Sequence, residues 1–260
     1  MRHQIGWLCL SMLTVTAQAG VVVHMAQKGA AGEQAKDRSV IYAQDGFLRV
    51  DDLDSQGRVD RMTLFRDGVV WQVEIAERTF QKFDKNAFAA QQGGMQARMQ
   101  AMAATLPPDK RAVFEARMQA MQQKAIDYSL ADAGRSERVN TYSCEVWRVT
   151  RNGNVSAEYC IAAKGSLPGG DELVDASHKA AAIAVDVVSA VPQMAQAVPP
   201  LYLLYGKMDG FPVLVRQISG NSTADETSLS RIERQALAPE KFEIPHGFTE
   251  TQPGAGRAKD

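Results

Sequence analysis

The stretch Tyr142–Cys160, YSCEVWRVTRNGNVSAEYC, decides the local fold, because it places two cysteines near the ends of a predicted β-hairpin. Asn-Gly between two alternating runs of β-branched and aromatic residues is the strongest short signal for a hairpin. If Arg151–Gly153 form a three-residue loop, Cys144 lies directly opposite Cys160, whereas a two-residue loop puts Cys144 opposite Ile161. In either register the two sulfur atoms are near enough for a β-bulge to bring them within bonding distance.

The N-terminus predicts export from the cytosol. Arg2 precedes an uncharged apolar run, Ile5–Thr16, and Ala17–Ala19 have the small-x-small pattern of a cleavage site, so residues 1–19 are predicted to be a signal peptide. The apolar run is shorter than the roughly 20 residues that span a bilayer. Cleavage would remove one of the three cysteines. We therefore expect a periplasmic protein in which the remaining pair, Cys144–Cys160, forms a disulfide, with two buried free thiols as the alternative.

Composition is typical of one ordinary globular domain. The 260 residues are 45% hydrophobic and 23% charged, with a net charge of -1. A nearly neutral chain offers no electrostatic basis for binding nucleic acid or an anionic membrane surface. We predict a flexible lead-in over 20–38, a single domain over 39–250 and a disordered tail over 251–260.

Short segments with a period of two predict the strands of the domain. Those between Ser39 and Phe83 are separated by turn sequences such as Asp67-Gly68 and predict an antiparallel meander. Two further runs, 201–220 and 226–237, predict the closing strands of the same sheet. The alternation of apolar and polar residues indicates a sheet with one face buried.

Two segments predict helices. Residues 86–124 are rich in Ala, Gln, Met and Arg, with a break at 105–109, and predict a helical hairpin inserted between strands. Its apolar residues recur at helical spacing: Met95, Met99 and Met102, then Phe114, Met118 and Met121. This stripe predicts a packing face, with a flexible Met-lined surface over an apolar groove and copper(I) binding by thioethers as alternatives. Residues 171–190 predict a second, Ala- and Val-rich helix.

Several segments in this order resemble a bacterial family of exported proteins of unknown function: Met62–Phe83, Leu106–Met118, the cysteine hairpin, Asp209–Ile218 and Leu229–Phe248. That family is similar to the periplasmic lipoprotein carriers and to the related sigma-regulator sensor domain. The resemblance implies an α+β fold: an antiparallel, strongly curved β-sheet (half-barrel) whose concave face is covered by the inserted helical hairpin and a further helix. In that family an aromatic residue is commoner at the place of Cys160.

The curved sheet that the resemblance implies provides candidate residues for an apolar cavity. Alternation along the strands and the methionine stripe of the insertion select eight of them, with an ordinary packed core as the alternative. They are Phe65, Trp71, Ile75, Phe80, Met99, Met102, Phe114 and Met118.

The sequence contains no recognisable catalytic or metal-binding motif. His24, His178 and His246 belong to no spaced metal-ligand set, and no nucleophile elbow or phosphate-binding glycine loop is present. We therefore expect no enzyme, no metal and no cofactor, but a periplasmic protein that binds or carries an apolar, lipid-like ligand. The alternatives are an envelope protein-protein interaction or sensor module with a filled core and, more weakly, copper handling by methionine.

Overall fold

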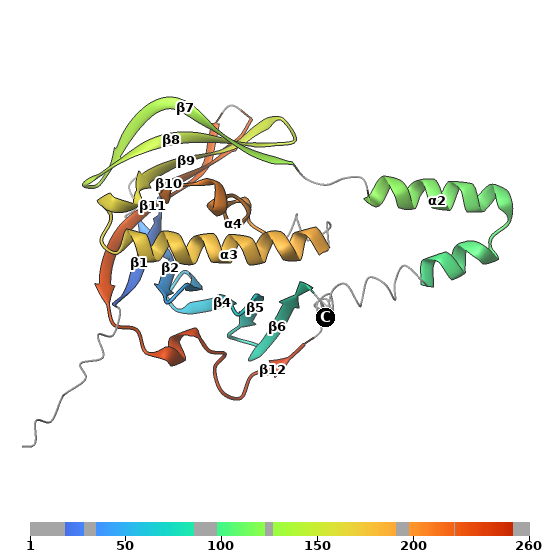
Figure 1. Ribbon diagram of the computed structural model, residues 1–260, viewed down its shortest axis with the longest axis horizontal. Helices are drawn as coiled ribbons and strands as arrows, with labels where there is room; N and C mark the ends of the chain where they lie inside the picture. Colours follow the sequence, from blue (N-terminus) through green and yellow to red (C-terminus); the bar gives the residue numbers. More distant parts are fainter. Residues whose placement is uncertain are drawn as a thin grey trace, which may run out of the picture.

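The computed structural model describes residues 19–28, 35–85, 98–122, 127–190, 198–220 and 222–251 (Figure 1). Within them the strands and helices follow in chain order as β1 Gly20–Gln27, β2 Lys36–Gln44, β3 Phe47–Leu53, β4 Val59–Arg66, β5 Val69–Glu74, β6 Thr79–Asp84, α2 Pro108–Gln122, β7 Tyr128–Val139, β8 Tyr142–Arg151, β9 Asn154–Ala163, η1 Lys164–Ser166, α3 Gly170–Ala190, α4 Pro200–Leu204, η3 Tyr205–Lys207, β10 Gly210–Ser219, β11 Ser222–Gln235, η4 Pro239–Phe242 and β12 Thr249–Glu250.

One curved, open sheet of 12 strands organises the molecule, which confirms an α+β fold built on an antiparallel sheet. The strand order is β12-β6-β5-β4-β3-β2-β1-β11-β10-β9-β8-β7. All neighbouring strands are antiparallel except β12, which runs parallel to β6. The pairing of β1 with β11 joins the N-terminal meander to the strands that follow the insertion, and the predicted meander over 39–83 is confirmed as β2–β6.

The predicted flexible lead-in over 20–38 is wrong at 20–27 and 36–38, which belong to β1 and β2, whereas residues 29–34 lie outside the described part. β1 occupies the middle of the sheet, and both of its faces are buried: Val21 and Val23 are 0% exposed and Val22 is 2% exposed. A continuous run of β-branched residues is typical of a strand covered on both sides. Gly20 begins this strand where a side chain would collide with Leu237 and Gln44.

The cysteine hairpin forms as β8 and β9, and the Cys144–Cys160 disulfide is confirmed with a Cα–Cα distance of 5.2 Å. Asn152 and Gly153 form the two-residue turn, both with positive φ angles (51° and 81°), as a hairpin turn of this length requires. An irregularity next to Val149 then shifts the register by one residue, so that Cys160 pairs with Val146. The cysteines therefore lie diagonally on one face, in neither of the two predicted registers.

Helix α3 covers the concave face of the sheet (Figure 1). Its buried residues recur every three or four positions and pack with the strands in the largest core cluster: Leu173, Ala176, Ala180, Ala184 and Val187. Asp171 and Glu172 in its first turn lie at the positive end of the helix dipole. The predicted helix over 171–190 is confirmed.

The inserted hairpin does not cover the concave face, which corrects the prediction. Its described part consists of a helix over 98–105 and α2, and it extends away from the sheet (Figure 1). None of its described side chains belongs to a core cluster, and the helices that pack against the concave face are α3 and α4. Arg111 stabilises the corner of the hairpin by donating to the carbonyls of Ala103 and Ala104, both at 3.0 Å. Among the described helices, none is long and apolar enough to cross a membrane.

The strand predicted from residue 201 begins only at Gly210, because 200–207 form α4 and η3 instead. Pro200 stands at the first position of this helix, where its missing N–H costs nothing. Residues 236–251, here called the C-terminal strap, cross the convex face of β1–β6 (Figure 1). Its main-chain N–H groups hold it there: Leu237 N donates to the side-chain oxygen Oε1 of Gln44, and Thr251 N donates to the Phe80 carbonyl.

Replacing both cysteines by alanine is expected to lower the free energy of unfolding by about 3 kcal/mol, because the disulfide closes a loop of this length. Urea unfolding of the Cys144→Ala/Cys160→Ala variant, followed by circular dichroism, measures the difference. The unchanged protein in excess reductant serves as the control and should lose a similar amount. A double variant as stable as the oxidised parent contradicts the expectation.

Candidate functional site

The four strand residues predicted to line the cavity lie on two different faces of the sheet. Phe65 is 3% exposed on the concave face and packs against Tyr202 of α4, with ring centroids 5.0 Å apart. Trp71, Ile75 and Phe80 pack on the convex face beneath the C-terminal strap. The register explains the split: Leu64 pairs with Trp71, so Phe65, its neighbour along β4, points to the opposite side.

The four insertion residues predicted to line the cavity lie outside the concave face. Met99 and Phe114 are half-buried within the insertion, and Met102 is 57% exposed. The side chain of Met118 and residue Met95 lie outside the described part. The eight predicted residues therefore do not form one site, and copper(I) binding by the thioethers stays a prediction.

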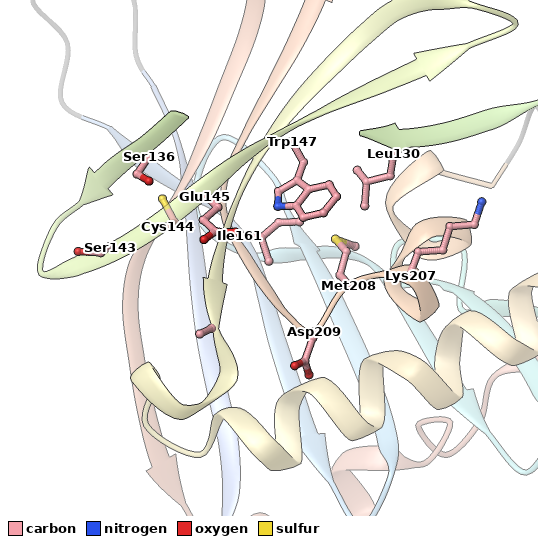
Figure 2. Close-up of a pocket in the computed structure, with 11 residues that line it drawn as sticks. Leu130, Ser136, Ser143, Cys144, Glu145, Trp147, Ile161, Lys207, Met208 and Asp209 are labelled. Carbon is pink, nitrogen blue, oxygen red and sulfur yellow. The ribbon is translucent and has the colours of Figure 1, made fainter. Parts of the chain in front are cut away.

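The concave side contains a different pocket, of about 550 Å³, between β7–β9 and the turn that leads from η3 into β10 (Figure 2). Pockets that bind small molecules typically have volumes of about 300–1,000 Å³. Its lining consists of Leu130, Ser136, Ser143, Cys144, Glu145, Trp147, Ile161, Ala163, Lys207, Met208 and Asp209.

Apolar side chains from three strands and from the turn after η3 converge in this pocket. Figure 2 shows Trp147 of β8 beside Leu130 of β7, with Ile161 and Met208 below the indole ring. Trp147 is paired with Tyr159 and therefore lies on the face opposite the disulfide. Met208 is 3% exposed, and His178 of α3 contacts its carbonyl through Nε2 at 2.7 Å. Met208, at the floor of the pocket, is thus held against α3, the helix that covers the concave face of the sheet.

The charged groups of the pocket lie along its rim. Lys207 Nζ donates to the Tyr128 carbonyl at 3.5 Å, a long contact that leaves the ammonium group accessible. Asp209 Oδ1 is 3.0 Å from Lys164 Nζ, and this pairing raises the pKa of Lys164. Glu145 is exposed at the side away from Lys207 (Figure 2). The arrangement is an apolar wall with the Lys207 ammonium group at one end and the Glu145 carboxylate at the other.

An arginine cluster fastens the β7–β8 hairpin that forms one wall of the pocket. The Arg216 guanidinium of β10 donates to both carboxylate oxygens of Glu137 on β7, at 2.9 and 2.7 Å, and to Glu226 on β11 at 2.8 Å. Arg135 donates to Glu158 on β9 at 3.2 and 2.6 Å. A break in the pairing of β7 with β8 between Asp132 and Ser136 allows the hairpin end to fold back over these strands. Long-range ion pairs therefore position a strand that lies at the edge of the sheet.

One other cluster has residue types used in nucleophilic catalysis, but its geometry does not fit that chemistry. His24 Nδ1 lies 2.9 Å from Asp37 Oδ2, and the Ser230 hydroxyl donates to Asp37 Oδ1 at 2.7 Å. In a catalytic triad the hydroxyl bonds to the other imidazole nitrogen. Here Arg231 Nη2 lies 2.7 Å from that nitrogen, so the cluster bridges β1, β2 and β11. Within the described residues, no group of three or more His, Cys, Asp or Glu side chains is placed to hold a metal ion.

The sequence contained a signal for part of this pocket. Trp147 lies within the cysteine hairpin. Because side chains alternate between the two faces of a strand, Trp147, three residues after Cys144, is expected on the face opposite the cysteine. Lys207 and Met208 follow a short helix in a segment whose sequence predicts a strand, so their place could not be predicted.

Comparisons with known proteins give no family. No family model matches the chain, and no curated protein matches it. Similar solved structures include an uncharacterized conserved protein from Thermus thermophilus, with a TM-score of 0.41 and 8% identity over 91% of each chain. Two structures of PNGF-II have TM-scores of 0.42 and 0.43, with 7% and 5% identity, and the matches cover 31% and 32% of those chains. Likenesses this distant carry no argument about function, and they do not support the resemblance to lipoprotein carriers.

The arginine cluster predicts that acid weakens the fold. Hydrogen bonding by Arg216 holds the pKa of Glu137 and of Glu226 below the usual 4.5. A carboxyl group with a depressed folded pKa contributes stability that is complete above its unfolded pKa and is lost as pH falls through the folded pKa. We expect the free energy of unfolding to fall less between about pH 5 and pH 3 in an Arg216→Met variant than in the parent.

Urea unfolding at several pH values measures this difference. Arg148→Met is the matched control, because Arg148 is 52% exposed and its contact with Glu158 is long, at 3.8 Å, and therefore weak. It should keep the parent's acid dependence. Equal acid dependence in the parent and the Arg216→Met variant would show that the cluster does not set the pKa of these carboxyl groups.

Proposed function

We propose that this protein is a non-enzymatic periplasmic binding or carrier protein, built as a half-barrel, that holds an apolar, lipid-like ligand in the pocket between β7–β9 and η3. One observation carries the proposal: a pocket of about 550 Å³ with an apolar wall of Leu130, Trp147, Ile161 and Met208. Met and Trp side chains suit this role, since Met adapts to irregular ligands and Trp has a large apolar surface.

The charged residues at the rim of the pocket favour a ligand that is an acyl chain with a carboxylate head. The Lys207 ammonium is available at the end of the apolar wall, and the rim carboxylate of Asp209 is paired with Lys164. A carboxylate beside Lys207 would form a charge-assisted contact while its chain lies along Trp147. The disulfide supports the location, because such bonds persist in oxidising compartments such as the periplasm.

Titration with dodecanoate tests the proposal. In a Trp71→Phe background that begins at Gly20, Trp147 is the remaining tryptophan, and its emission should change saturably as the acyl chain displaces water. Leu130→Asp should abolish this change, because it puts a charge in the apolar wall. Val113→Asp is the matched control, since Val113 is 70% exposed on α2, and it should bind as the parent does.

Native mass spectrometry of the parent, purified from periplasm, gives a second readout. A bound acyl species that Leu130→Asp lacks and Val113→Asp retains supports the pocket. Unchanged Trp147 emission together with no adduct in the parent contradicts the proposal.

A second candidate function is an envelope interaction module, and the inserted hairpin is the observation that favours it. The described part of the insertion extends away from the sheet, with Met102 57% exposed and Val113 70% exposed (Figure 1). An exposed apolar surface on a projecting arm is typical of a protein-protein contact.

Site-specific photocrosslinking in cells tests this second candidate. A photoreactive residue at Val113 should capture one defined partner, whereas the same residue at Val155, which is 46% exposed on β9, should not. Replacing residues 86–126 with a flexible linker should remove that partner from native complexes. No capture at Val113, together with unchanged native complexes in the deletion variant, would rule the candidate out.

A further inference from the structure

A second, smaller hollow lies on the concave face, on the other side of α4 from the pocket between β7–β9 and η3. It has a volume of about 170 Å³ and is enclosed by β3–β6, the last turns of α3 and the start of α4. This volume is below the range of about 300–1,000 Å³ that is typical of sites for drug-sized ligands. Any ligand must therefore be small.

The sheet side of this hollow is arranged in three rows, because neighbouring strands are in register. The outer row is Asp52, Arg61 and Glu74, paired across β3, β4 and β5. The middle row is neutral and polar, with Thr63 opposite Gln72. The inner row is apolar, with Phe65, Val70 and Phe83 next to α3. The lining therefore changes from charged to apolar over the width of three residue rows.

The outer row has an excess of negative charge. Arg61 Nε donates to Glu74 Oε1 at 3.0 Å, which leaves the Asp52 carboxylate without an ion pair among the described residues. The adjacent Asp51, by contrast, points to the opposite face and bonds Arg49 at 2.6 and 2.7 Å. Burial raises the pKa of Asp52, and the guanidinium groups of Arg61 and Arg38 offset this only in part.

From this cavity and its charge pattern, we propose that the hollow is a binding site for a small amphipathic primary amine. Its ammonium group would pair with Asp52 and bond to Gln72, and its apolar part would lie against Phe65, Phe83 and Tyr202. The Phe65 and Tyr202 rings are 5.0 Å apart and offer faces that attract a cation as well as apolar surface. An anionic ligand would meet the Asp52 and Glu74 carboxylates, and an uncharged one would leave the half-buried Asp52 charge unpaired.

Isothermal titration of the full chain with 2-phenylethylamine tests the site. 2-Phenylethanol and 3-phenylpropionate, an uncharged and an anionic analogue of similar size, are the comparison ligands. The amine is expected to bind at least about tenfold more tightly than the alcohol, since a hydrogen bond to a charged group contributes about 1.5–3 kcal/mol. The acid is expected not to bind.

Asp52→Asn should weaken amine binding by about tenfold or more. Asp67→Asn is the matched control, because Asp67 is 66% exposed in the turn between β4 and β5 and does not line the hollow, and it should leave the affinity unchanged. Spectral shifts in ¹H–¹⁵N NMR of the unchanged chain should centre on Thr63 and Gln72, a readout independent of any variant. Equal affinity for amine and alcohol, shifts centred elsewhere, or no amine binding up to about 10 mM would overturn the proposal.

Discussion

The packing of α3 against the concave face is the interaction on which the rest of the structure depends. An open sheet of 12 strands has an apolar face that must be covered, and α3 covers it with a stripe of small side chains. Ala176, Ala180 and Ala184 allow the helix backbone to approach the strands closely. The start of the helix is equally constrained, since a side chain at Gly170 would overlap the Lys164 carbonyl. The position of α3 decides which parts of the concave face remain open.

The convex face of β1–β6 is covered by a different segment, the C-terminal strap. Phe242 and Ile244 of the strap complete two apolar clusters that the sheet alone leaves open. A buried ion pair orients the strap: Asp51 is 1% exposed and holds Arg49, whose guanidinium also donates to the Lys241 carbonyl at 2.9 Å. Replacing such a pair by apolar residues is often neutral or stabilising, so its contribution here is the placement of the strap more than added stability.

Features set by neighbouring residues could be predicted from the sequence. The hairpin at Asn152–Gly153, the meander over 39–83 and the helix over 171–190 each follow from local turn chemistry or periodicity. The place of β1 follows from its pairing with β11, about 200 residues away, which no local pattern contains. The stripe of the insertion indicates a helix face correctly, but periodicity does not say what a face packs against. For the same reason, Phe65 and Trp71 were assigned to one cavity although the register separates them.

The short helix α4 and the turn η3 divide the open part of the concave face into two hollows with different charged groups at their edges. Tyr202, Tyr205 and Phe211 form the wall between them, with successive ring centroids 6.1 Å apart. Beyond η3, the available charge is the Lys207 ammonium beside an apolar wall; before α4, it is the Asp52 carboxylate above an apolar floor. A single open groove would bring these charges to one ligand and favour a zwitterion. Because aromatic rings separate them, each of the two proposed ligands would meet only the charge of its own hollow, and the segment that begins at Pro200 would keep the two sites apart.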